Sequence, residues 1–292
     1  ITAVVSAIAV NMTHEIMHKD ADRILNNVAQ KEAAYINDVL GDMKKSATIM
    51  QHYAKTEIND IDDLKNAEFL ETYLEKNKKM FSEIAINTSG VEGYFMRINP
   101  EYTDSKTGFY NIVNEDSTVR EMQITDLSKY DQNDTKNAGW YYTAVKEGKA
   151  VWLEPYYNGK IEEPVISYVV PIYQKEILIG VAGMDILFAD IVDKIAEVSA
   201  LDTGIAYLVN EQNEIMYHPE GKTEFPVDDI QGWNQFVAES QSDVEGTYVY
   251  EYRDENGKHK LACFGLDNNM RLLLSASTNE IDADNNKMVK AV

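Results

Sequence analysis

The segments Trp140-Tyr141, Trp152-Leu153-Glu154-Pro155-Tyr156-Tyr157, Pro171-Ile172 and Gly180-Val181-Ala182-Gly183-Met184-Asp185-Ile186 follow one another, in this order, in the middle of the 292-residue chain. Aromatic and β-branched residues are frequent in them, which favours strands of a largely buried sheet. Each segment alone is a weak signal. Their order and spacing predict the fold, and the rest of the chain is interpreted outward from them.

The segments predict a β-hairpin and a third strand. The aromatic-rich run 152–157 is followed by Asn158-Gly159, a dipeptide that tolerates positive φ at both central positions of a tight turn. Residues 165–173 then run apolar with β-branched residues, and residues 177–181 form a third apolar stretch. Asp185 follows where that strand is expected to end. A single carboxylate therefore lies beside a largely buried sheet, where it needs a partner.

The same region contains the residues for a small ligand-binding box. Trp140, Tyr141 and Tyr156 offer aromatic faces, and Asp185 offers one carboxylate. Such a box suits an ammonium group, because a cation–π contact contributes about 0.5–2 kcal/mol and the carboxylate adds a charge-assisted hydrogen bond. An amine or amino acid is the expected guest. The alternative is that the aromatic residues are core and that Asp185 caps a helix starting at about Phe188.

The order and spacing of these residues resemble the membrane-distal half of the double Cache family of extracellular bacterial sensor domains. In the amino-acid-binding branch of that family, a Tyr, an Arg two residues before a Trp-Tyr pair, a later Tyr and a final Asp hold the ligand. Trp140, Tyr141, Tyr156 and Asp185 match positions of that pattern. The resemblance implies that the chain senses a ligand and does not catalyse a reaction.

Two positions depart from the family pattern. Ala138 stands where the family places the Arg that clamps the ligand carboxylate, and Asn133 stands where it places the first Tyr. Arg97 and Lys136 are the alternative sources of positive charge. Tyr94 and Arg97, on a predicted strand, complete the candidate ligand-binding set. The sequence thus still predicts a ligand with an ammonium group, but it does not fix the other end of the ligand. Amines, modified amino acids and other small polar metabolites all stay candidate ligands.

Composition limits the partners and the chemistry. The net charge is −22 and no basic patch is visible, which argues against binding to nucleic acid or to an anionic membrane face. A single cysteine, Cys263, rules out an internal disulfide. His259 would lie about 13 Å from it along a strand, too far for a catalytic dyad. We predict no cofactor, no metal site and no catalytic residue.

The first helix is expected to be long. Apolar residues recur at near-helical spacing through 11–55, with Gly41 as the interruption. The alternative is a helical hairpin or coiled coil inside an ordinary α+β domain. Residues 1–10 are apolar but too few to cross a bilayer of about 30 Å, and they are interpreted as the outer end of a transmembrane helix. A signal peptide or a buried helical turn is the alternative for that stretch.

The rest of the chain is predicted to form shorter helices and strands. A second helix is predicted at 68–79, and a polar loop at 130–139 is expected to act as a lid. Strand candidates before this loop are 93–98, 109–113 and 119–124. After a helix at 189–200, the strand candidates are 205–209, 214–217, 246–253, 258–264 and 271–277, with a helix at 233–239 and a hairpin turn at Asn256-Gly257.

The predicted fold class is α+β: a long N-terminal helix followed by two PAS-like (Cache) modules, each an antiparallel sheet flanked by helices. We expect a juxtamembrane and dimerisation helix, a ligand-binding membrane-distal module, a membrane-proximal module and a segment leading to a second transmembrane helix. Their limits are 1–55, 56–188, 189–278 and 279–292. The proximal module contains no residue that we assign to a ligand.

The resemblance implies an extracytoplasmic sensing domain of a transmembrane signal-transduction receptor at the cell membrane. It also implies a small-molecule partner, membrane anchoring of the full-length protein and a homodimer formed through the first helix. Whether the output is a chemotaxis receptor, a histidine kinase or a cyclic-dinucleotide enzyme stays open. A solute-binding ectodomain without signal output would share the same pocket.

One sequence motif favours a different class of protein, an enzyme. His14-Glu15-Ile16-Met17-His18 is a literal H-E-x-x-H on a predicted helix, the arrangement that holds Zn²⁺ in metallopeptidases. A third ligand is required. Glu32 and Asp38 would lie at least about 20 Å along the same straight helix, and the next histidine is His52. The zinc peptidase is therefore a minor alternative, beside adventitious metal binding and an ordinary exposed helix.

Overall fold

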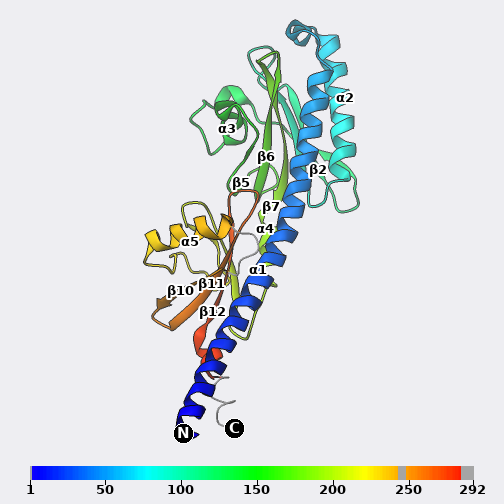
Figure 1. Ribbon diagram of the computed structural model, residues 1–292. Helices are drawn as coiled ribbons and strands as arrows, with labels where there is room; N and C mark the ends of the chain where they lie inside the picture. The colour runs from blue at the N-terminus through cyan, green and yellow to red at the C-terminus, as the bar shows by residue number, and fades with distance from the viewer. Residues whose placement is uncertain (1, 243–247, 284–292) are drawn as a thin grey trace. The chain divides into compact units, whose positions relative to one another are not determined.

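A computed structural model describes residues 2–242 and 248–283 of the chain (Figure 1). The chain divides into two compact units. Unit 1 comprises residues 1–37 and 192–292, and unit 2 comprises residues 38–191. The division at 191/192 lies close to the boundary at 188/189 expected between the two modules. The predicted domain limits themselves stay predictions.

Helix α1 (Thr2–Thr56) contributes its first part to unit 1 and its second part to unit 2. One stripe of this helix is buried, because apolar side chains recur every three or four residues, which is the repeat of an α-helix. The buried positions are Ala21, Leu25, Ala29, Ala33, Ile36, Leu40, Met43, Ala47, Met50 and Ala54. The long helix expected at 11–55 is confirmed, and it begins earlier than expected.

Unit 2 is built around an antiparallel sheet, which has seven strands among the described residues. Their order is β3-β2-β1-β7-β6-β4, with β5 beside β6. The strands are β1 (Gly93–Ile98), β2 (Gly108–Val113), β3 (Val119–Glu121), β4 (Val151–Trp152), β5 (Tyr156–Asn158), β6 (Glu163–Gln174) and β7 (Ile177–Leu187). The strand expected at 93–98 is confirmed at both ends, whereas the one expected at 119–124 ends at Glu121.

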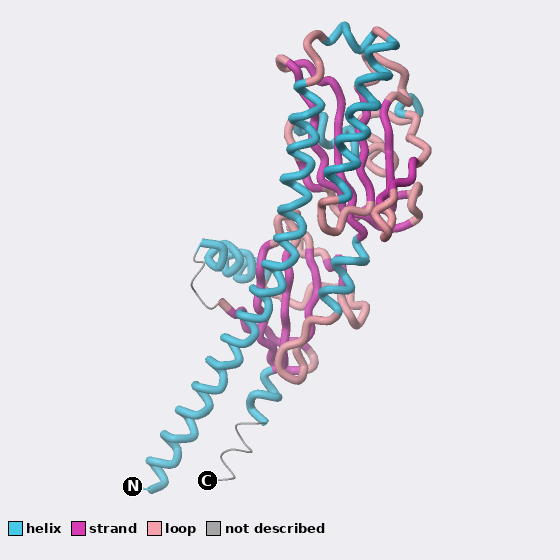
Figure 2. The backbone as a smooth tube through the Cα atoms, turned by 90° about the vertical axis from the view of Figure 1, so that its right-hand side faces the viewer, coloured by secondary structure: helices cyan, strands magenta, loops and turns pink. Residues whose placement is uncertain are grey.

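Helices cover both faces of this sheet. They are η1 (Ile61–Lys65), α2 (Ala67–Ile86), η2 (Leu127–Lys129) and α3 (Gly139–Glu147). Asn66 caps the start of α2, since its side chain accepts hydrogen bonds from two backbone N–H groups of the first turn. It lies beside the second part of α1 on one face of the strands (Figure 2), and the ring of Phe81 packs on that of Phe109. Helix α3 packs on the other face, against β6 and β7.

Unit 1 contains a second antiparallel sheet, of five strands in the order β10-β11-β12-β8-β9 among the described residues. Helix α4 (Phe188–Ala196) leads into it, and α5 (Ile230–Ser242) packs against β11 with the fully buried ring of Trp233 at the centre of the contact. The strands are β8 (Ile205–Val209), β9 (Ile215–Tyr217), β10 (Val249–Asp254), β11 (Gly257–Gly265) and β12 (Arg271–Ser277). The α+β fold class is confirmed.

Both predicted hairpin turns are displaced. Asn158 is the last residue of β5, paired with Glu163, so the turn consists of residues 159–162 and is not a two-residue turn. The cause is an Asx turn, in which the side-chain oxygen of Asn158 accepts from the backbone N–H of Lys160. In unit 1 the two turn residues are 255 and 256, one position earlier than expected.

The terminal segments were expected to lead toward a membrane. Among residues 2–242 and 248–283, no helix combines the length and the hydropathy that a membrane span requires. Most of the segment 279–292, expected to lead to a second transmembrane helix, lies outside the described residues.

The close approach of β1 and β7 yields a prediction. A Cβ added at Gly180 would overlap the backbone carbonyl of Arg97, so Gly180→Ala is expected to destabilise the protein by about 2 kcal/mol or more. Gly41, inside α1, has no atom within 4 Å of such a Cβ, so Gly41→Ala is expected to stabilise it by about 0.5–1 kcal/mol. Urea unfolding followed by circular dichroism measures both. Equal effects of the two substitutions would contradict the strand contact.

Candidate functional site

A cavity of about 410 Å³ lies in unit 2, on the face of the sheet that α3 covers. Strands β1, β2, β5 and β7 contribute to its wall, together with the start of α3 and the loops around η2. Its aromatic residues are Phe95, Tyr110, Tyr130, Trp140, Tyr156 and Tyr157. The cavity has the size of an ordinary small-molecule site.

The carboxylate of Asp185 lies on β7 and is fully buried in the wall of this cavity. Ser167, opposite it on β6, donates a hydrogen bond of 2.6 Å. The hydroxyl of Tyr110 donates one of 3.1 Å, and the side-chain amide of Asn158 lies at 3.4 Å. Gly93, opposite Asp185 on β1, leaves room for the ring of Tyr110. The carboxylate is thus held by neutral donors from three strands of the sheet, β2, β5 and β6.

Burial raises the pKa of the Asp185 carboxyl to about 6, against an ordinary value of 3.8. The hydrogen bonds from Ser167 and Tyr110 lower the pKa, and the nearby charge of Glu92 raises it, but desolvation is the largest cause. Among the described residues, no Lys, Arg or His forms an ion pair with Asp185 within 4.0 Å. Above pH 6 the site therefore holds a buried negative charge that no cation of the described part of the chain neutralises.

The aromatic wall is fixed by packing on the sheet. The ring of Phe95 lies over Gly183, where a Cβ would come within 2.5 Å of it. Trp140 packs edge-on against Phe95 at 5.1 Å between ring centroids, and its indole N–H donates to the carbonyl of Asn137. The hydroxyl of Tyr156 lies 2.9 Å from that of Ser167, which also binds Asp185. The aromatic faces and the carboxylate therefore belong to one connected site.

Positive charge also faces the cavity. Arg97 is 1% exposed and donates to the backbone carbonyls of Ser105, at 2.6 Å, and Thr107, at 3.3 Å. Its guanidinium lies 5.8 Å from the ring centroid of Trp140. Burial lowers the pKa of Arg97 to about 10, which leaves it charged at neutral pH. In the part of the chain that the structure describes, Arg97 makes no ion pair within 4.0 Å.

Lysines add further charge at the edge of the site. They are Lys106, Lys129, Lys136 and Lys160. Only the first of them pairs with an acid among the described residues, Asp126 at 3.7 Å. The loop expected to be a lid, 130–139, contributes Tyr130, Lys136 and Asn137 to the cavity wall. That this loop moves as a lid stays a prediction.

The structure brings four of the six expected site residues together. Trp140, Tyr156, Asp185 and Arg97 all line the cavity. Ala138, where the family pattern has an arginine, is fully buried in the core beneath α3 and offers no polar group. The side chains that offer positive charge therefore come from β1 and the surrounding loops.

Tyr94 and Tyr141 do not line the cavity. Tyr94 alternates with its neighbours along β1, so its ring points to the opposite face of the sheet and packs on Phe109. Tyr141 is buried in the core between α3 and the sheet, and burial raises the pKa of its hydroxyl. The assignment of Tyr94 to the ligand site is corrected, and Tyr141 is a residue that supports the wall from behind.

Sequence reasoning missed Tyr110, Asn158 and Ser167. The Asn-Gly pattern indicates a turn at Asn158, and Tyr110 falls within the strand candidate 109–113 with no further signal. The signal for Ser167 was available, because it is a small polar residue inside an otherwise apolar strand. A polar residue in a strand buried on both faces needs a hydrogen-bonding partner, and here that partner is Asp185.

Unit 1 offers less. A cavity of about 170 Å³ lies beside β8, β9 and β11, lined in part by Tyr207, His218 and His259. His259 pairs with Asp254 at 2.9 Å. Cys263 is buried and unpaired, and burial raises the pKa of its thiol to about 12, so it remains protonated at neutral pH. A protonated thiol is a poor nucleophile.

Solved structures of sensory domains share this fold. The periplasmic sensory domain of the Campylobacter jejuni chemoreceptor Tlp1 matches with a TM-score of 0.66 and 15% identity, over 91% of this chain and 98% of that one. The sensory domain of C. jejuni Tlp3 with isoleucine bound matches at 0.61 and 14%, over 93% and 98%. The ligand-binding domain of the Pseudomonas aeruginosa amino acid chemoreceptor PctC, in complex with GABA, matches at 0.56 and 15%, over 88% and 99%.

At these identities the likeness shows a shared fold. The sequence profile of the Cache domain family, in contrast, matches residues 13–284, nearly the whole chain. The resemblance inferred from Trp140, Tyr156 and Asp185 is therefore confirmed. The chain belongs to the Cache domain family, in its double form a family of extracellular ligand-sensing domains.

Proposed function

We propose that the chain is the extracytoplasmic sensing domain of a membrane-anchored signalling receptor, and that its unit 2 cavity binds a small amino acid or related amine. The observation that carries the proposal is the buried carboxylate of Asp185, which has neutral donors but, among residues 2–242 and 248–283, no cation within 4.0 Å. A ligand ammonium group supplies the missing counter-charge.

The cavity offers an ammonium group both kinds of contact that it prefers. Asp185 accepts a charge-assisted hydrogen bond, and the rings of Trp140 and Tyr156, which line the same cavity, offer cation–π attraction. An amine that loses its water shell on entry is compensated by these contacts. A neutral or anionic group at the same place would leave the carboxylate unpaired, so the site discriminates by charge.

The other end of the ligand is proposed to be a carboxylate. Arg97 has no acidic partner within 4.0 Å among the described residues, and Lys129 and Lys136 line the same cavity. On β1, Arg97 stands four residues from Gly93, the neighbour of Asp185, which separates the two backbone positions by about 13 Å. The long arginine side chain and a zwitterionic ligand together span this interval. Isoleucine and GABA, the ligands of two structural relatives, carry the same pair of charged groups.

Signal generation is proposed to follow from differential affinity. The ligand contacts the sheet through Asp185 and the loop 130–139 through Lys136, so it favours the conformation in which both contacts are made. No catalytic step is proposed for the chain, and enzymatic output would belong to another part of the receptor.

Dimerisation through α1 is part of the proposal. Ile8, Met12 and Ile16 are each more than half exposed and recur every four residues, which forms an apolar face that a second copy would cover. Met12→Glu is expected to shift the monomer–dimer equilibrium toward the monomer at least tenfold, measured by sedimentation velocity. Met12→Leu, which keeps the apolar face, should leave the equilibrium unchanged. A monomeric wild-type domain at high concentration would contradict this part.

Asp185→Asn tests the ammonium site. In a thermal-shift screen against amino acids, amines and carboxylates, a ligand at 100 times its Kd adds about 2.7 kcal/mol to the wild-type stability. The variant keeps the shape of the site but not its charge, so the shift caused by amine-bearing compounds should vanish. Asp42→Asn, an exposed carboxylate on α1, is the matched control and should bind like wild type.

The same variant has a second readout that proves it is folded. The folded state favours protonated Asp185, so this contribution to stability is fully present below about pH 4 and is lost as the pH rises through about 6. The full shift corresponds to roughly 3 kcal/mol. Without ligand, Asp185→Asn should therefore be more stable than wild type at pH 7.5 and lose that advantage at pH 4. An unaltered ligand shift in this folded variant would refute the site.

Lys136→Ala tests the carboxylate end. The probes are GABA and propylamine, which differ only by the carboxylate, or the equivalent pair for the amino acid that gives the largest shift. Because Lys136 is exposed, its loss is expected to weaken binding of the amino acid about two- to fivefold and to leave the amine unaffected. Arg97→Lys should weaken it more. Lys149→Ala, outside the cavity, is the control, and an equal effect on both probes would exclude a role for Lys136 in binding the carboxylate.

A further inference from the structure

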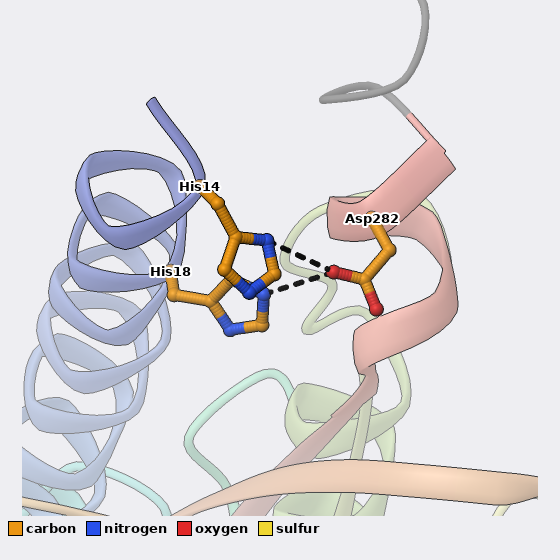
Figure 3. Close-up of side chains that lie close together, drawn as sticks. All are labelled: His14, His18 and Asp282. Carbon is orange, nitrogen blue, oxygen red and sulfur yellow. Dashed lines mark hydrogen bonds and ion pairs between the residues drawn. The ribbon is translucent and has the colours of Figure 1, made fainter. Parts of the chain in front are cut away.

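We propose that His14, His18 and Asp282 form a binding site for a zinc-type divalent metal ion, which joins the start of α1 to the helical residues 278–283 (Figure 3). All three side chains belong to unit 1. The inference is independent of the proposed ligand cavity, which lies in unit 2.

The geometry of the three side chains approaches that of a tetrahedral metal site. His14 and His18 are four residues apart on α1, so their rings lie on one face, 4.3 Å apart between centroids. One carboxylate oxygen of Asp282 lies 3.4 Å from Nδ1 of His14 and 3.1 Å from Nε2 of His18. Zinc bound at about 2.0–2.1 Å holds neighbouring tetrahedral ligands about 3.3 Å apart. Both distances to Asp282 are therefore near those of a loaded site.

Asp282 is positioned by the fold and not by the histidines alone. Strand β12 lies between β8 and β11 in the sheet, and residues 278–283 follow it directly as a helical turn. Ile281 is 6% exposed, so it holds this turn against the unit while the next residue, Asp282, faces α1 (Figure 3). Asp282 and His18 are 264 positions apart in the sequence, so no local pattern accounts for their meeting.

The donor set selects the kind of ion. Two imidazole nitrogens and one carboxylate oxygen suit Zn²⁺, Co²⁺ or Ni²⁺, whereas Ca²⁺ and Mg²⁺ prefer oxygen ligands throughout. The side chains of His14 and Asp282 are 45% and 44% exposed, and that of His18 is 21% exposed, so an ion can reach them from solvent. Three protein ligands leave a fourth position for water.

The site differs from that of a metallopeptidase. The ligand that completes the two histidines comes from a separate turn near the chain's end, and neither of the two cavities described above includes these residues. An ion bound there bridges two segments that are distant in sequence. We assign it the role of a clasp, in which metal binding holds residues 278–283 against α1.

The test is zinc titration of the full 292-residue chain by isothermal calorimetry, with Co²⁺ absorption as a report on coordination. Wild type is expected to bind one Zn²⁺ per chain. His14→Ala/His18→Ala should lose this binding, and Asp282→Asn should weaken it at least tenfold. His52→Ala, on the same helix but outside the cluster, is the matched control and should bind like wild type. Thermal melts in EDTA verify that every variant is folded.

Zinc should also raise the melting temperature of wild type and His52→Ala more than that of Asp282→Asn, because the ion binds the variant more weakly and no longer bridges the two segments. Unchanged stoichiometry and affinity in the folded double-histidine variant would overturn the site. Retained affinity in Asp282→Asn would overturn the clasp. Zinc-dependent peptide hydrolysis that is lost in Glu15→Gln would replace the clasp with a catalytic role.

Discussion

The site in unit 2 depends on one electrostatic constraint, the burial of the Asp185 carboxylate among neutral donors. A carboxylate removed from water must be hydrogen-bonded, protonated or paired with a cation. Ser167, Tyr110 and Asn158 provide hydrogen bonds, and burial still raises its pKa to about 6. The free domain therefore carries an unfavourable charge at neutral pH. Any ligand that brings a positive charge removes this destabilisation as it binds, which connects ligand binding directly to folding free energy.

The sheet register follows from the same constraint. Ser167 faces Asp185 from β6 and Gly93 faces it from β1, and a slip of one residue on either strand would turn the required donor or the open space to the opposite face. Glycines at 93 and 183 let the rings of Tyr110 and Phe95 come close to the strands, where a Cβ would otherwise crowd or overlap them. The aromatic wall is thus available only because these two positions lack side chains. Arg97 stands on the same face of β1, so the register that places the donor also places a positive charge at the far end of the cavity.

The parts of this arrangement that depend on local pattern could be predicted from the sequence. The strand at 93–98 and the long helix were available from periodicity, and the series Trp140, Tyr156 and Asp185 was available from the resemblance to the double Cache pattern. Which side chains of 93–98 face the cavity could not be predicted. Every residue of that strand is buried, so polarity does not distinguish its two faces. Tyr94 was therefore assigned to the wrong face. Asn158 was misread because Asn-Gly is a strong turn signal, while the chain uses this asparagine in an Asx turn and as a donor to the site.

The H-E-x-x-H motif shows why a spacing alone does not define a chemistry. Spacing four residues apart on a helix places two imidazoles together in any protein that contains it. What decides the outcome is the third ligand and the space around it. Sequence reasoning sought that ligand along α1, where helix geometry separates candidates by 1.5 Å per residue, and it could not find one that is 264 positions away. In this fold the third group is a carboxylate on the turn that follows β12. An ion held between that turn and α1 resists their separation. Two histidines at this spacing serve peptide hydrolysis in metallopeptidases, whereas in this chain their meeting with Asp282 favours a mechanical role.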